Sequence, residues 1–271
     1  MKIKNSNNSN NSKNGNIGAN AASDSAKLRA QLNAMYLKYV AQHFEVFGQQ
    51  AALAQSSHVD YLAQLIDGET TGREDRSTER RIAAARFPVL KTLEQYDWSW
   101  PTHINQMQIR HLFRLDFLKD NGNVIFIGNV GLGKSHFATA LAHTACLHGH
   151  SALFTTAINI INSIAAAQAT GGIKREMSKY LKPSVLVIDE LGYLPIDKFG
   201  ADCLFQVISG RYERSSTIIT TNRAFKNWAE IFNNDSVITS ALLDRLLHHA
   251  ETVLIEGKSY RMKDQIDNLK V

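Results

Sequence analysis

The sequence has few cysteines and no long apolar run. Its 271 residues include two cysteines, Cys146 and Cys203, whose spacing fits neither a metal site nor a disulfide framework. We expect both to be small buried apolar residues. No stretch approaches the roughly 18 uninterrupted apolar residues of a membrane-spanning helix, and the N-terminus lacks the apolar core of a secretory signal. We therefore expect a cytoplasmic globular protein with no membrane partner.

Positively charged residues outnumber negatively charged residues only slightly. The formal net charge of +5 and the pI of about 9.1 are compatible with a polyanionic partner, although an excess of this size is also common on proteins that do not bind nucleic acid. No repeat of fixed period is visible. The length is sufficient for one α/β domain and a smaller module.

The N-terminal part of the chain divides by composition. Asparagine, serine, glycine and lysine dominate the first twenty residues, so we expect a disordered tail over 1–24. Apolar residues then recur at helical spacing between Leu28 and Val46 and between Val59 and Ile66. This pattern predicts a helical module over 25–86, interrupted at Gly68 and Gly72 and ended by Pro88.

Arginines cluster near the end of that module, at Arg73, Arg76, Arg80 and Arg81. A solvated helix face with internal ion pairs is one interpretation. A surface that contacts nucleic-acid phosphates is the other. A connector over 87–104 follows, and its Trp98 and Trp100 are expected to pack against the next domain rather than stack on bases.

Strands and helices alternate from Asn123 onward. Short apolar or β-branched runs predict strands at Asn123–Ile127, Ala152–Thr156, Val185–Ile188, Thr217–Thr220 and Thr252–Glu256. Longer helical segments separate them, which is typical of a parallel sheet covered by helices on both faces. The sequence therefore predicts an α/β domain with a five-stranded parallel sheet over 105–265, followed by a short tail over 266–271.

A phosphate-binding loop follows the first of these strands. The octapeptide Gly128-Asn129-Val130-Gly131-Leu132-Gly133-Lys134-Ser135 fits the pattern G-x-x-x-x-G-K-[ST] without a mismatch, and a helix opens with His136. Glycines let backbone N–H groups point at an anion, Lys134 adds a mobile charge, and the Ser135 hydroxyl suits Mg²⁺. The expected ligand is a nucleoside triphosphate, bound by residues 128–136.

Two carboxylates end the strand Val185–Ile188. Asp189 is predicted to hold Mg²⁺ together with Ser135 and water, because the carboxyl edge of a parallel sheet is where ligands bind. Glu190 projects differently by the two-residue period of a strand, so it can act on the attacking water. Together with the phosphate-binding loop, this pair favours hydrolysis over simple binding.

An amide and an arginine complete the list of candidates. Asn222 follows the strand Thr217–Thr220 and is expected beside Asp189, where its amide can contact water or the γ-phosphate. Arg245 lies in an otherwise apolar helical run, so it either pairs with an acid such as Asp244 or reaches across a subunit interface. Arg211 and Arg214 are rivals, but they close a helix, where cations offset the helix dipole.

These motifs together resemble the IstB-like helper ATPases of insertion sequences. The family belongs to the initiator and helicase-loader branch of AAA+ ATPases, related to DnaC and DnaA. The likeness runs from about Arg80 to Lys263, and the segments that carry it are RFPVLKTLEQYDW, FIGNVGLGKSHFATALA, VLVIDELGYLPID, RYERSSTIITTNRAF, SALLDRLLHHA and GKSYRMK.

The resemblance implies an ATP- and Mg²⁺-dependent ATPase that oligomerises on duplex DNA and recruits a partner transposase. Lys134, Glu190, Asn222 and Arg245 would be its catalytic residues, with Arg245 acting as an arginine finger on a neighbouring subunit. Relatives contact DNA between the second strand and the acidic strand, which adds Lys174, Arg175 and Lys179 to the DNA-binding candidates. The chain has no room for a C-terminal helical lid, so Arg261 is only a weak candidate for a sensing arginine.

Three other functions share parts of this pattern. A loader of a replicative helicase would use the same catalytic residues with a different partner. A non-hydrolysing DNA-architectural protein would use ATP as a structural ligand, and the pair Asp189-Glu190 argues against it. A small-molecule kinase is disfavoured because Asn222 and Arg245 suit water attack at a subunit interface.

Overall fold

The structure is a computed structural model that describes residues 13–100 and 102–262. The chain divides into two compact units, Met1–Ser77 and Thr78–Val271. Residues 1–12 of the predicted N-terminal tail and the predicted C-terminal tail, 266–271, lie outside the described residues.

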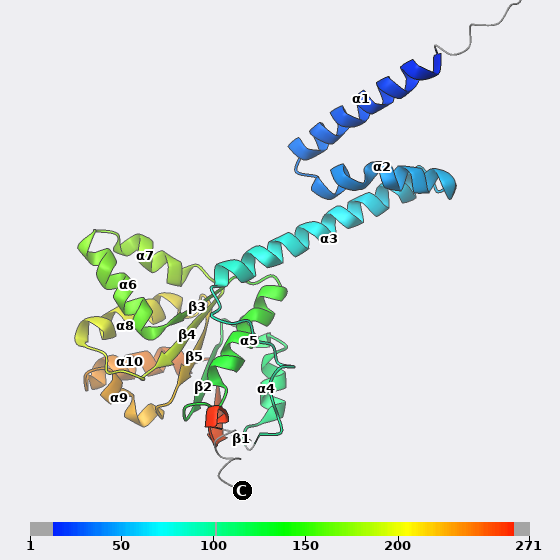
Figure 1. Cartoon of the computed structure of the whole chain (residues 1–271). Helices are drawn as coiled ribbons and strands as arrows, with labels where there is room; N and C mark the ends of the chain where they lie inside the picture. The colour runs from blue at the N-terminus through cyan, green and yellow to red at the C-terminus, as the bar shows by residue number, and fades with distance from the viewer. Residues whose placement is uncertain (1–12, 101, 263–271) are drawn as a thin grey trace, which may run out of the picture. The chain divides into compact units, whose positions relative to one another are not determined.

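The N-terminal unit is helical, as the sequence predicts. It contains α1 (Lys13–Ala34), α2 (Lys38–Leu53) and the first part of α3 (His58–Ala85) (Figure 1). Residues 13–24 of the predicted tail belong to α1. Extending a helix adds one hydrogen bond per residue once a nucleus exists, so the apolar repeat beyond Ala26 can propagate back into a polar segment.

Helix α3 runs without a break through Gly68 and Gly72, so the predicted interruption is wrong. A Cβ at Gly68 would lie 2.0 Å from a ring carbon of Tyr39, at the start of α2. The glycine therefore allows two helices to approach closely and does not break the second one. The helix ends at Ala85, before Pro88, as predicted.

The carboxylate of Glu69 joins α3 to α2. It accepts hydrogen bonds from the backbone N–H groups of Tyr39 at 2.7 Å and Val40 at 3.4 Å, and thereby caps α2, whose own N-cap residue makes no side-chain hydrogen bond. Arg73 and Arg76 each lie 3.1 Å from the same carboxylate. Burial raises the pKa of Glu69, but the bonds from Arg73 and the backbone outweigh it and leave the pKa below its usual value.

The second unit is built on a sheet with the strand order β1-β6-β2-β5-β4-β3. Its strands are β1 (Thr102–His103), β2 (Asn123–Gly128), β3 (Ala152–Thr156), β4 (Val185–Leu191), β5 (Ser216–Thr221) and β6 (Ala250–Gly257). Strands β2 to β6 pair in parallel, which confirms the predicted five-stranded parallel sheet. The unpredicted β1 pairs antiparallel to β6; two residues are too few to leave a periodic pattern.

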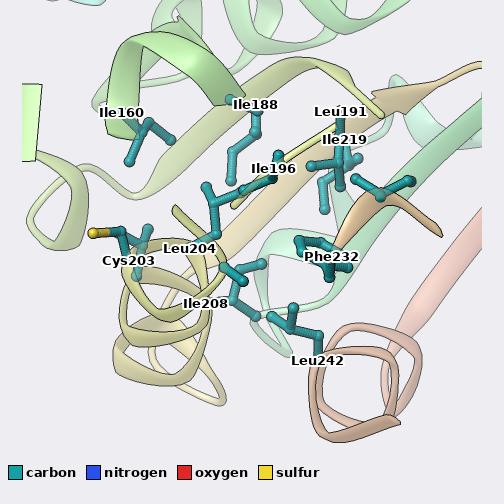
Figure 2. Packing of buried hydrophobic residues seen from close by; sticks show 14 of the residues in the cluster. Ile160, Ile188, Leu191, Ile196, Cys203, Leu204, Ile208, Ile219, Phe232 and Leu242 are labelled. Atoms are coloured by element: carbon teal, nitrogen blue, oxygen red, sulfur yellow. The ribbon is translucent and has the colours of Figure 1, made fainter. Parts of the chain in front are cut away.

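Helices cover both faces of the sheet (Figure 1). Helices α4 (Gln106–Leu112) and α5 (Lys134–Leu147) supply one buried cluster with Val124 and Phe126 of β2. The other cluster includes Ile125 of β2. It is supplied by α6 (Ala157–Ala169), α7 (Ile173–Leu181), α8 (Lys198–Arg211), α9 (Trp228–Ile231) and α10 (Ser236–Leu247). Figure 2 shows part of this second cluster, including Cys203 of α8. Cys203 and Cys146 are both buried and free, as predicted.

Candidate nucleotide-binding site

The phosphate-binding loop joins β2 to α5 and depends on its glycines. Gly131 and Gly133 have φ angles of 80° and 90°, a region that side chains disfavour. A Cβ at Gly128 would lie 2.2 Å from the carbonyl oxygen of Ile255, and one at Gly133 would lie 2.7 Å from the ring of Tyr96. The loop conformation that the motif predicts is thus formed, with its N–H groups at the start of α5.

Lys134 and His136 occupy the first turn of α5. The ammonium of Lys134 donates to the carbonyl oxygen of Asn129 at 2.7 Å, so it lies over the loop. Burial lowers the pKa of Lys134, Asp189 opposes the effect, and the charge of Arg261 adds to it. His136 contacts the carbonyl oxygen of Thr92 in the connector at 2.8 Å, and burial lowers its pKa. The His136 ring therefore contacts the connector, and only the backbone of His136 can contribute to phosphate binding.

The carboxylate of Asp189 accepts hydrogen bonds from two hydroxyl groups. Ser135 Oγ donates to its Oδ1 at 2.8 Å, and Thr220 Oγ1 of the neighbouring strand donates to the same oxygen. Asp189 as a whole is 7% exposed. The structure thus brings together the two residues predicted for the metal and adds Thr220, which the sequence reasoning missed. A threonine in a β-branched strand carries no signal of its own.

Glu190 is turned out of the strand by the backbone. Its φ angle is 60°, and the register between β4 and β5 shifts between Ile188 and Leu191. Its N–H donates to Thr220 Oγ1 at 3.0 Å, and its side chain is exposed at the carboxyl edge. A bulge of this kind re-aims one side chain. The bulge therefore directs the Glu190 side chain further away from that of Asp189 than the alternation of side chains along a strand would.

Asn222 directly follows β5, one residue beyond Thr221. Its Oδ1 is buried and has no hydrogen-bond partner among the residues that the structure describes. Leaving a buried acceptor unpaired costs about 1–3 kcal/mol. This orphaned oxygen therefore favours a ligand or an ordered water beside Asn222.

The connector packs on the loop through its aromatic residues, as predicted. Tyr96 lies with its ring centroid 4.3 Å from that of Phe137 in α5, and its hydroxyl is 3.5 Å from the carbonyl oxygen of Leu132. Trp98 contacts Tyr96 edge to face, at 4.8 Å between centroids. These rings form a rigid wall beside Gly133 and belong to the core.

Arg245 lies at the opposite edge of the sheet. Its Nη1 donates to the carbonyl oxygen of Ala241 at 2.8 Å, and its guanidinium sits 5.0 Å from the ring centroid of Phe205. It lines a small cavity with Asn123 and Thr217, which stand at the amino ends of β2 and β5. The structure therefore does not bring Arg245 to Lys134 of the same chain.

The rival Arg211 has a structural role. It is 1% exposed and donates to the carbonyl oxygens of Tyr180 at 2.7 Å and Pro183 at 2.9 Å and to Thr217 Oγ1 at 3.1 Å. Burial lowers its pKa to about 9, which still leaves it charged at neutral pH. The prediction that it merely offsets a helix dipole understates its role, because it links α8 to the segment before β4 and to the start of β5.

The basic candidates for DNA binding fall into two groups. Some make contacts within the protein: Arg73 and Arg76 bind Glu69, Arg81 donates to the carbonyl oxygen of Cys146 at 3.0 Å, and Lys179 pairs with Glu176. Lys174 and Arg175 of α7 form the second group and are exposed, while Arg80 of α3 is exposed and also has an interaction within the protein. The predicted internal ion pairing applies to Arg73 and Arg76, with Glu69 as the acid.

Comparisons with known proteins identify the family to which the chain belongs. The family of IstB-like ATP binding proteins matches residues 30–268. An ATP-binding protein of insertion sequence IS21 from Pseudomonas aeruginosa is 36% identical over 239 residues, which is 88% of this chain and 90% of that protein.

Solved structures of two proteins share the fold of the second unit. DnaI superposes with a TM-score of 0.53 at 18% identity, covering 64% of this chain and 93% of that chain. The replication initiator DnaA bound to AMPPCP and single-stranded DNA has a TM-score of 0.52 at 18% identity, covering 66% and 54%. No helix within residues 13–100 and 102–262 is long and apolar enough to span a membrane. The chain belongs to the IstB-like family, the ATP-binding helper proteins of insertion sequences, and it has an AAA+ fold.

Proposed function

We propose that the protein hydrolyses ATP to ADP and phosphate at the carboxyl edge of its sheet. The observation that carries the proposal is the different placement of two adjacent carboxylates: Asp189 accepts hydrogen bonds from two hydroxyls, and the bulge turns Glu190 away from it. A site that only bound ATP would need no second carboxylate aimed elsewhere. The loop N–H groups and Lys134 would hold the phosphates.

The residues present fit a magnesium ion. Mg²⁺ prefers hard oxygen ligands and keeps several waters, and the Ser135 hydroxyl and Asp189 carboxylate meet at 2.8 Å beside the loop. These two side chains would hold the ion, with phosphate oxygens and water completing its shell. When bound, Mg²⁺ neutralises part of the phosphate charge.

Water attack requires a proton acceptor and an orienting group. Glu190 would accept the proton as the water oxygen bonds to the γ-phosphorus and the bond to the bridging oxygen of ADP breaks. Asn222, with its unpaired Oδ1 at the end of the adjacent strand, would orient that water. Lys134 would stabilise the charge on the phosphate oxygens.

A further cation would come from a neighbouring subunit. Arg245 sits at the amino edge and cannot serve the loop of its own chain without a large rearrangement. Supply of an arginine in trans is common in phosphoryl transfer. We therefore infer that ATP binds between subunits and that hydrolysis accompanies assembly.

The polymer on which the subunits assemble would be duplex DNA, and the assembly would recruit a transposase. Support comes from the insertion-sequence family and from the exposed cations Arg80, Lys174 and Arg175. The DnaA structure of the same fold holds single-stranded DNA, which supports a nucleic-acid partner in general. Phosphate contacts would give weak sequence preference and steep salt dependence.

Duplex binding measured against salt, with ATP, ADP or no nucleotide, tests the assembly model. Particle size is read in the same samples. We expect ATP to strengthen binding and enlarge the particle, and ADP to do neither. Binding that ignores the nucleotide, at constant particle size, would contradict the proposal. Pulldown with a transposase and with a replicative helicase then separates a transposition helper from a helicase loader.

A further inference from the structure

A cluster of three side chains that can bind a metal lies at the amino edge of the sheet. Glu213 stands in the turn between α8 and β5, and His248 and His249 stand in the turn between α10 and β6. Their ligand atoms, two imidazole nitrogens and one carboxylate oxygen, all lie within 4.8 Å of one another. His248 Nδ1 is 3.8 Å from Glu213 Oε1, and the two imidazole rings lie 4.1 Å apart between centroids. Two turns that are distant in the sequence thus bring three ligands to one point.

The segment that leads into β2 holds both of these turns by their backbone. The side-chain amide of Asn121 donates to the carbonyl oxygen of Glu213 at 3.1 Å. The N–H of Asn123 donates to the carbonyl oxygen of His249 at 2.7 Å, and its side-chain amide donates to the carbonyl oxygen of Leu246 at 3.0 Å. The ligands therefore start from fixed backbone positions, and side-chain rotation alone can bring their atoms closer. Such preorganisation lowers the entropy cost of binding.

Tyr212 orients the first of the two histidines. Its hydroxyl lies 2.9 Å from His248 Nδ1, and the two rings lie 5.8 Å apart between centroids. Histidines that bind metals usually have a hydrogen-bond partner of this kind, which sets the orientation of the ring. All three candidate ligands are exposed. An ion can therefore reach them from solvent, and water can fill any coordination position that the protein leaves open.

The donor set selects the kind of metal. Two imidazole nitrogens and one carboxylate suit zinc and related transition metals, whereas Mg²⁺ prefers a shell of oxygens. Zinc binds such ligands at about 2.0–2.2 Å, which in a tetrahedron places two ligand atoms about 3.3–3.6 Å apart. The separation of 3.8 Å between His248 Nδ1 and Glu213 Oε1 is close to this value. Three protein ligands leave the fourth position to water.

We propose that Glu213, His248 and His249 form a zinc site at the amino edge of the sheet. A bound ion links the turn after α8 to the end of α10 and so joins two segments that otherwise meet through the loop before β2. Arg245 lies one turn before His248 on α10, so zinc also fixes the end of the helix that carries this arginine. The site needs neither ATP nor its hydrolysis, because the phosphate-binding loop lies at the carboxyl edge.

Zinc titration of the untagged full chain tests the proposal. Nucleotide is left out because its phosphates bind divalent ions themselves. Competition with a chromophoric chelator measures the affinity and the number of ions per chain, and Mg²⁺ is titrated in parallel. We expect one zinc ion per chain, no competition from Mg²⁺, and a melting temperature that rises with zinc, because a ligand of the folded state stabilises it. Co²⁺ in the same site should give the visible absorption of a tetrahedral complex.

Three variants each remove one ligand at an exposed position: His248→Gln, His249→Gln and Glu213→Gln. We expect each to weaken zinc binding by about 100-fold or more, since losing even an outer partner of a metal ligand costs about 10–100-fold. The matched control is His148→Gln, because His148 is an exposed histidine that follows α5 as its C-cap, just as His248 follows α10. Its zinc affinity should change by less than about twofold.

Several results would overturn the zinc site. One is a wild type that binds no stoichiometric zinc, and another is an H249Q or E213Q variant that keeps the wild-type affinity. An equal loss in H148Q would show adsorption to surface histidines in general. Thermal unfolding without zinc shows that each variant folds, and if one of the three does not, the other two decide. ATP hydrolysis enters none of these measurements, so their outcome is independent of the proposed function.

Discussion

The polar side chains at the two edges of the parallel sheet differ in how far their hydrogen bonds are satisfied within one chain. At the carboxyl edge, the loop, Ser135, Asp189 and Thr220 are linked by hydrogen bonds within one chain. At the amino edge, Arg211 is buried and bonded to carbonyl groups. The partly exposed Arg245 donates, among the residues that the structure describes, only to its own helix, and its guanidinium lies over the ring of Phe205. The carboxyl edge is thus assembled within a single chain. The other edge presents a cation that a second subunit could use.

This difference shows why two arginines close in space take different roles. Arg211 donates to carbonyl oxygens before β4 and to the Thr217 hydroxyl at the start of β5, so its donors are used within the fold. Arg245 keeps donors available because its carbonyl partner lies one turn back on α10. A residue with unused donors near a surface can serve an interface at low cost.

The largest effect is expected from Lys134→Ala at the carboxyl edge. Removing the ammonium leaves the phosphates without their central cation, so ATP affinity should fall by about 100-fold or more. Isothermal titration measures it, with the exposed Lys119→Ala as the control. If K134A binds ATP as the wild type does, the loop is not the nucleotide site.

The next effect separates binding from turnover. Glu190→Gln should retain ATP affinity within about twofold, since the side chain does not hold the metal, while phosphate release falls by about 10²–10⁴-fold. Glu256→Gln, an exposed acid of β6, is the control. Wild-type phosphate release by E190Q would show that Glu190 is not the proton acceptor.

A third prediction concerns the amino edge. Arg245→Ala should leave ATP binding by the isolated chain intact but lower DNA-stimulated phosphate release by about 10³-fold, the lower range for an arginine finger. Arg214→Ala is the matched control because Arg214 is an exposed cation near the same edge. Equal losses in both variants would indicate a general charge effect.

The smallest effect is a pH dependence at the carboxyl edge. Burial lowers the pKa of His136, so below a pH of about 6.5 the unfolded chain binds a proton that the folded chain resists. The free energy of unfolding of the wild type should therefore fall as the pH drops from about 6.5, and His136→Gln should flatten that slope. Denaturant titrations across pH measure it, with the exposed His103→Gln as the control. An unchanged slope in H136Q would exclude this histidine as the cause.

Much of the carboxyl edge could be predicted because its signals are local. The phosphate-binding loop is predicted by the glycines of a single octapeptide. The apolar run that ends at Asp189 predicts a buried strand with its carboxyl end at the sheet edge. The strand order then brings Ser135 to Asp189 without further information. The fold class followed from the same alternation of strands and helices.

The remaining features depend on contacts between distant residues. Glu69 caps α2 from a different helix, so no spacing shows that bond, whereas its pairing with Arg73 is a local i, i+4 contact within α3. Thr220, the bulge at Glu190 and the bond from Tyr260 to Gly131 each join separate segments. Gly68 was misread as a break because close packing on Tyr39, which only the fold shows, is what requires it.

Mixing two inactive variants tests most directly whether the two edges form one site between subunits. Arg245→Ala and Glu190→Gln are combined on duplex DNA with ATP, and phosphate release is measured against the mixing ratio. A shared site predicts recovered activity, highest near equal amounts, because an interface between an R245A loop and an E190Q arginine is intact. Activity that stays at the sum of the two variants at every ratio would contradict the account.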